Sequence, residues 1–154
     1  MTIWKIIALA TLIAATVANA EEQEKKIQRS DLPPAVEQTV AAQSRGATIK
    51  GFSQEKKNGQ TYYEAEMTVH GHTKDVLIDP NGNVVEVEEQ VALDSLPTAV
   101  KDGLQAKAGK GKIVKVESLT KHDKLVAYEA KVQTAGKRSE IQVGPDGTPL
   151  DHEE

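Results

Sequence analysis

One unit is written twice in this chain of 154 residues, and the duplication constrains the fold more than any other feature. The tripeptide Tyr-Glu-Ala stands at 63–65 and again at 128–130. Each copy runs through a glycine and alternating apolar residues to a turn sequence, Pro-Asn-Gly at 80–82 and Pro-Asp-Gly at 145–147. Both pairs of motifs are separated by 65 residues. We therefore expect two similar units within one domain.

Each unit begins with a stretch typical of a short amphipathic helix. Leu-Pro-x-Ala-Val occurs at 32–36 and at 96–100, and apolar residues then recur every four positions. Asp31 and Ser95 are the expected N-caps, each with proline in the first turn of the helix behind it. Gly46 is the expected left-handed residue after the first helix.

Beyond each helix the hydrophobic period changes to two, which is typical of strands with one buried face. Tyr63 and Met67 are expected to face the helix, whereas Tyr62 and Glu64 are expected to face solvent. Turn sequences divide each unit into four such segments. The sequence thus predicts an α+β fold, in which two tandem helix-plus-four-stranded antiparallel meander repeats share one core. They would form one sheet with both helices on one face.

The order of segments along the chain predicts export. Residues 1–20 combine a basic start, an apolar run and Ala-Asn-Ala ending at Ala20, which is the pattern of a cleaved secretory signal peptide. Residues 21–30 are polar and are expected to form a flexible arm. The first repeat is assigned to residues 31–90 and the second to 94–151. A periplasmic or secreted location follows, with no membrane anchoring after cleavage.

Charge and composition exclude several classes of function. Without the expected signal peptide the chain carries 18 basic and 23 acidic residues, a net charge of −5, which argues against a nucleic-acid partner. The absence of cysteine excludes disulfides and thiol chemistry. Aromatic residues make up 3% of the chain, so we expect stability to come from buried aliphatic side chains.

The two copies resemble the PepSY and PepSY-like families. The resemblance rests on Leu-Pro-x-Ala-Val, the helix, Tyr-Glu-Ala, the glycine turn and the (Asp/Gly)-Pro-(Asn/Asp)-Gly turn, and it covers nearly all of residues 31–150, once per repeat. These families share the helix-plus-antiparallel-sheet unit of the beta-lactamase-inhibitor protein. The resemblance implies a small exported binding module, associated with peptidase propeptides and with inhibition of secreted or periplasmic proteases. It implies no fixed set of catalytic residues.

The candidate binding residues lie on the expected solvent-facing side of the sheet. They are Tyr62, Glu64, Glu66, Thr68, Glu129 and Lys131. An exposed tyrosine beside acidic neighbours suits an anchor for a protein or peptide partner. An edge strand that pairs with a peptide is the other route to a partner. No motif indicates an enzyme or a cofactor.

A small-ligand or metal-responsive periplasmic binding protein is the alternative function, using His70, His72 and the acidic face. A zinc site needs three or four converging ligands, and the sequence predicts no such site. Asp79-x-Asn81-x-Asn83 superficially resembles a calcium loop but lacks the required glycine and the final acid. We therefore interpret that segment as a hairpin turn.

Overall fold

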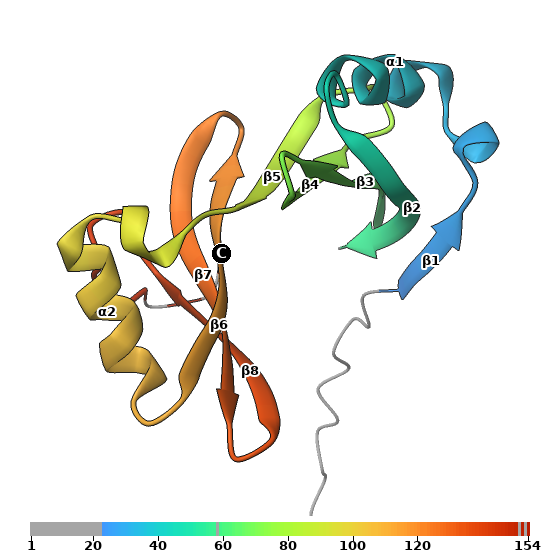
Figure 1. Cartoon of the computed structure of the whole chain (residues 1–154). Helices are drawn as coiled ribbons and strands as arrows, with labels where there is room; N and C mark the ends of the chain where they lie inside the picture. Colours follow the sequence, from blue (N-terminus) through green and yellow to red (C-terminus); the bar gives the residue numbers. More distant parts are fainter. Residues whose placement is uncertain (1–22, 58, 151, 153) are drawn as a thin grey trace, which may run out of the picture.

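The computed structural model describes residues 23–57, 59–150, 152 and 154. In these residues a single antiparallel sheet of eight strands runs in the order β1 to β8, so each strand pairs with its neighbours in sequence (Figure 1). Two α-helices, α1 (Pro34–Gln43) and α2 (Thr98–Ala108), each follow a short 3-10 turn. The strands are β1 (Gln23–Ile27), β2 (Thr48–Lys57), β3 (Gln60–Val69), β4 (His72–Ile78), β5 (Val84–Gln90), β6 (Lys112–Lys121), β7 (Lys124–Thr134) and β8 (Lys137–Val143).

The expected signal peptide, residues 1–20, lies outside the described residues. In the part of the chain that the structure describes, no helix has the length and apolarity needed to cross a membrane.

The prediction of a flexible arm over residues 21–30 is wrong for its described part. Gln23–Ile27 forms β1, which pairs with β2 from Gln23↔Lys56 to Ile27↔Phe52. Ile27 packs against the buried cluster beneath α1. The strand was missed because a polar edge strand with one apolar residue shows no alternation. Its stability comes from backbone pairing with a distant segment.

The prediction of four strands in the second unit is also wrong. After β8 the chain makes only an isolated bridge between Val143 and Pro149. Proline has no N–H group to donate to a ladder, so the pairing with β8 does not extend beyond the bridge at Pro149. The described sheet therefore reaches eight strands through β1, which precedes the first unit, and not through a fourth strand in the second.

Two hydrophobic clusters form the core, in place of the single shared core that the sequence predicted. Val36 and Val40 of α1 pack on one end of the sheet, and Val100 and Leu104 of α2 pack on the other. The two clusters have no buried residue in common. The prediction that Tyr63 faces a helix-covered core is confirmed, and Tyr128 packs in the same way against the second cluster.

Both helices cover the same face of the sheet. Val87 of β5 packs in the cluster beneath α1 and pairs with Thr120 of β6. Val116, four residues earlier on β6, packs beneath α2. Because strand side chains alternate, Val116 and Thr120 point to one side, so the two clusters lie on that side. The opposite face of the sheet is left uncovered by the helices.

The expected N-caps are wrong, because a 3-10 turn precedes each helix. The Asp31 carboxylate accepts a hydrogen bond from the Gln28 amide at 2.8 Å, and the Ser95 hydroxyl donates to the Ala92 carbonyl at 2.7 Å. Both side chains therefore close the turn and leave the cap positions to prolines. Gly46 has the expected positive φ of 76°.

The turn after β4 is a hairpin turn, as the sequence indicated. The Asp79 carboxylate accepts hydrogen bonds from the backbone amides of Asn81 and Asn83, at 2.8 and 2.9 Å. This turn and its counterpart at 145–147 lie directly against the helices. A side chain at Gly82 would place its Cβ 2.7 Å from the Ala35 carbonyl oxygen, and one at Gly147 would collide with the Ala99 carbonyl.

We predict that Gly147→Ala destabilises the protein far more than Gly136→Ala. Both glycines have positive φ, 83° and 81°, but nothing lies within 4 Å of a Cβ at Gly136. The two variants share a backbone cost of roughly 1–2 kcal/mol, and only Gly147→Ala adds a steric clash of about 1–3 kcal/mol. Urea unfolding measures the difference. Equal losses in the two variants would contradict the close approach of turn and helix.

Candidate binding groove on the acidic face

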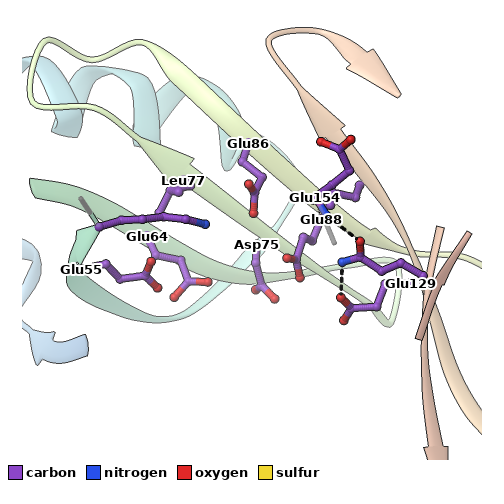
Figure 2. Close-up of a pocket in the computed structure, with 11 residues that line it drawn as sticks. Glu55, Glu64, Asp75, Leu77, Glu86, Glu88, Glu129 and Glu154 are labelled. Atoms are coloured by element: carbon purple, nitrogen blue, oxygen red, sulfur yellow. Dashed lines mark hydrogen bonds between the residues drawn. The ribbon is translucent and has the colours of Figure 1, made fainter. Parts of the chain in front are cut away.

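The uncovered face of the sheet is hollowed into a cleft of about 220 Å³, which we call the acidic groove (Figure 2). Among the described residues its lining holds seven carboxylates and one lysine. The lining residues are Glu55, Lys57, Glu64, Asp75, Leu77, Glu86, Glu88, Leu119, Glu129, Gln142 and Glu154.

The same alternation that buries the core places these acids in the groove. Val76 and Val87 pair across β4 and β5 in the core, so their neighbours point the other way. Asp75 pairs with Glu88 on the groove face. Figure 2 shows the carboxyl groups of Glu64, Asp75 and Glu88 lying side by side along this face. The groove is therefore the direct counterpart of the hydrophobic cluster beneath α1.

Glu88 lies in the most unfavourable position for a negative charge. Burial, and after it the charges of four neighbouring carboxylates, Glu129 and Glu117 foremost, together raise the pKa of its carboxyl to about 8. Among the described residues, no cation is one of the main influences on that pKa. Burial likewise raises the pKa of Asp75 to about 6, with Glu64 and Glu117 acting in the same sense. In the middle of the groove, Glu88 thus retains its proton near neutral pH, and Asp75 retains its proton only at mildly acidic pH.

Two further groove acids are held in place by hydrogen bonds. The buried Ser53 hydroxyl donates to Glu64 at 2.8 Å, and the Gln142 amide donates to Glu129 at 2.9 Å. Burial raises the pKa of both carboxyls, although each hydrogen bond opposes the shift. These contacts fix carboxyl groups that come from β3 and β7.

One acid near the groove, Glu117, has counter-ions within the protein itself. Glu117 is 1% exposed, and its carboxylate lies 2.5 Å from the Lys115 ammonium and 3.5 Å from that of Lys131. Its Oε2 atom accepts no hydrogen bond from the described residues, so the ion pair with Lys131 is its polar contact. A buried carboxylate in this fold thus takes ammonium groups as counter-ions.

Three acids in and beside the groove lie close enough together to be considered as ligands of a metal ion. Asp75, Glu88 and Glu117 offer oxygen atoms that all lie within 4.8 Å of one another, and hard divalent cations prefer such ligands. However, an ion there would face the ammonium groups of Lys115 and Lys131. Repulsion between like charges makes this group of acids a poor metal site.

The histidines of the alternative function do not lie in the groove. His70 and His72 are both exposed, at the hairpin that joins β3 to β4. Neither lines the acidic groove, and the two groups of converging acids found in the described residues contain no histidine. The structure does not bring these two histidines to the acidic groove.

The structure brings together two of the six predicted binding residues. Glu64 and Glu129 both line the acidic groove, although they come from different units of the chain. Tyr62 lies beyond the end of the groove, where its hydroxyl donates to Gln60 at 2.6 Å.

The other three predicted residues do not line the acidic groove. Glu66 is ion-paired with Lys26 of β1, and Lys131 with Glu117. Thr68 is half-buried and pairs with Thr73 across β3 and β4. Their partners come from other strands, so pattern reasoning within one strand could not identify them.

Sequence reasoning missed Glu86 and Glu88. Their signal was the alternation of valine and glutamate in β5. The register of the β4–β5 pair shifts, because Leu77 pairs with Glu86 but Ile78 pairs with Val84. This shift interrupts the simple alternation of core and groove residues along β5. Val84 and Val87 therefore pack on the core, whereas Val85 lines a hollow beside the groove.

Comparison with known proteins supports the architecture. No protein-family model and no curated protein matches this chain. Among solved structures, a BLIP-like protein from Bacteroides fragilis is 26% identical with a TM-score of 0.58, covering 80% of this chain and 86% of its own. The chain has a BLIP-like fold.

Two further solved structures show the same fold at lower identity. A protein from Bacteroides eggerthii whose name describes it as periplasmic is 20% identical, with a TM-score of 0.63 over 77% of this chain and 86% of its own. A DUF2874 family protein from Bacteroides ovatus is 21% identical, with a TM-score of 0.60 over 79% of this chain and 86% of its own.

We predict that Glu88→Gln stabilises the protein by an amount that grows as pH rises above about 4 and levels off above about pH 8. Unfolded, Glu88 titrates near pH 4.3, so between there and about pH 8 the folded state binds more protons than the unfolded state. The free energy of unfolding of the parent protein therefore falls as pH rises from about 4.3 to about 8, because Glu88 must lose its proton in the folded state. The melting temperature of Glu88→Gln should exceed that of the parent at pH 9, and the gain should vanish near pH 4.

Asp102→Asn is the matched control, because it removes one carboxylate from the exposed side of α2. Melting curves followed by circular dichroism from pH 4 to pH 9 make the comparison. A gain for Glu88→Gln that is the same at every pH would show that Glu88 is not a destabilising charge.

Proposed function

We propose that this chain is an exported, non-enzymatic binding module of the PepSY-like kind, whose acidic groove binds a cationic segment of a protein or peptide partner. The proposal includes cleavage after Ala20, release into the periplasm or the medium, and two tandem repeats at 31–90 and 94–151. A secreted or periplasmic protease is one partner class that suits it. The BLIP-like fold and the family resemblance support an exported binding role.

The observation that carries the proposal is the excess of carboxylates in the groove. Glu117 shows how the fold satisfies a buried acid, with two lysines of the same chain. In the described part of the chain, the main influences on the pKa of Glu88 are burial and neighbouring carboxylates, and no cation is among them. A lysine or arginine from a partner would give Glu88 a positively charged counter-ion, as Lys115 and Lys131 give one to Glu117. Such charge-assisted contacts are strong where water is partly excluded.

The extent of the groove favours a protein segment over a small ligand. Its lining residues come from every strand between β2 and β8, and they range from Glu55 on one side to Gln142 on the other. A cationic side chain fills only part of this width. The negative field also repels anions, including nucleic-acid phosphates, and accelerates encounter with basic proteins.

A small cation is the second candidate ligand, favoured by the convergence of Asp75, Glu88 and Glu117. The two lysines that contact Glu117 weigh against it. We therefore treat a divalent ion as a competitor to be tested and not as the proposed ligand.

We predict that the mature chain binds fluorescein-labelled decalysine at low salt and that Glu64→Gln/Glu88→Gln weakens the complex at least tenfold. Both substitutions remove groove carboxylates without removing side-chain volume. Fluorescence anisotropy measures the dissociation constant, which should rise with ionic strength because exposed charges are screened.

The control is Asp94→Asn/Asp102→Asn, which changes net charge equally but lies on the exposed side near α2. Equal weakening by the two double variants would mean that net charge alone attracts the probe, and the proposal would fail. Competition by calcium at one ion per chain would identify a metal site instead.

Binding of decalysine should strengthen as pH rises from 6 to 8.5. A bound ammonium group favours the ionised form of Glu88, so the complex lowers a pKa that stands at about 8 in the free protein. Below about pH 8, Glu88 should therefore release a proton when decalysine binds. Calorimetry in two buffers of different ionisation enthalpy counts the protons, and their number should fall in Glu88→Gln. Proton uptake on binding would contradict this assignment.

A further inference from the structure

The acidic groove does not end at its carboxylates. A second hollow shares Lys57, Leu77 and Glu86 with the groove. Its other lining residues are Tyr62, Val85, His122 and Lys121, and the Lys121 ammonium lies 3.9 Å from the Glu86 carboxylate. Tyr62, Val85 and His122 also line a third hollow, together with Pro80. Each hollow thus adjoins the next, because neighbouring hollows share lining residues. We call this row of three hollows, from the acids of the groove to Tyr62 and Val85, the channel.

The two ends of this channel differ in chemistry. At the end of the sheet, where the β4–β5 turn meets the start of β3, the third hollow combines polar groups with the Tyr62 ring, Val85 and the Pro80 ring. Its polar lining residues are Gln60, Thr61, Asp79, Asn81 and His122. Tyr62 is half-buried, and its hydroxyl is already bonded to Gln60, so the ring is the part available for contact. Such a surface accepts an apolar side chain. The groove itself accepts cationic side chains.

The strand register sets the spacing between these sites. Glu64 pairs with Leu77, which pairs with Glu86, and Asp75 pairs with Glu88 two residues further along β4. Tyr62 lies two residues before Glu64 on the same face of β3. The apolar site and the two acidic levels therefore follow one another at intervals of about 7 Å, the length of two extended residues.

An extended peptide has the same repeat. Its side chains on one side also recur every two residues, about 7 Å apart. A segment lying along the strands can therefore place an apolar side chain at Tyr62, a first cation beside Glu64, and a second between Asp75 and Glu88. Glu86 is left out of the first site because Lys121 already contacts it. The residues between them point away from the sheet.

We infer that the partner segment is an extended strand carrying one apolar residue and, two and four positions away, two lysines or arginines. This inference rests on the proposed function, and it adds the chemistry and the spacing of the ligand. The order of the three residues along the partner chain follows from the direction in which the segment lies, so both orders have to be tested.

The probes are capped nine-residue peptides of identical composition. In the in-phase peptide, phenylalanine is followed by lysine two and four positions later, with threonine elsewhere, and a second peptide has the reverse order. In the out-of-phase peptide the lysines stand one and three positions from phenylalanine. Extended, that peptide presents its lysines and its ring on opposite sides.

We expect one in-phase peptide to bind at least tenfold more tightly than the out-of-phase peptide, as measured by titration with NMR detection. Amide shifts at Tyr62, Val85 and His122 should accompany the in-phase complex. Tyr62→Ala should remove the preference, whereas Tyr62→Phe should keep it because the ring is retained. Glu88→Gln should weaken every peptide, and Asp102→Asn should weaken none.

The outcomes separate this inference from the proposed function. If all nine-residue peptides bind equally, or if Tyr62→Ala leaves the preference intact, the inference is wrong. It is equally wrong if decalysine binds and none of these peptides does. In each of these cases a loss of decalysine binding in Glu64→Gln/Glu88→Gln would leave the proposed function standing. If neither decalysine nor any peptide binds, both are overturned.

Discussion

The burial of alternate strand side chains beneath two helices is the constraint on which this structure depends. Covering one face of the sheet with α1 and α2 assigns every second strand residue to the other face. Val76 and Val87 enter the core, and Asp75 and Glu88 are thereby directed into the groove. With no cysteine in the chain, aliphatic burial holds this division in place.

The groove concentrates charge that the fold only partly compensates. Lys115 and Lys131 neutralise Glu117, whereas Glu88 remains among carboxylates and holds its proton up to about pH 8. Burying a charge without a partner costs free energy, and the cost is reduced when a counter-ion arrives. In the proposed function, the carboxylate whose ionisation destabilises the free protein would be stabilised by a cationic group of the partner. Architecture alone would not reveal this, because one fold serves many functions.

Two corrections show where local patterns lose their predictive power. β1 contains a single apolar residue that packs on the core, and it exists because β2 offers a backbone to pair with. At the other end, Pro149 limits the last pairing to a bridge. The register shift beside Val84 leaves Val85 outside the core and in the channel near Tyr62. In each case the deciding interaction joins segments that are not adjacent in sequence.

The sequence alone determined the two helices, the alternating strands, the turns and the equivalent core positions of Tyr63 and Tyr128, because each depends on the spacing of residues within one short segment. It also placed Glu64 and Glu129 on the exposed face. Only the tertiary structure decided that these two carboxyls share one groove with Glu88. That convergence depends on the pairing of β5 with β6, which joins the two halves of the chain into one sheet. The raised pKa values follow from burial in that groove, and burial is a property of the assembled sheet.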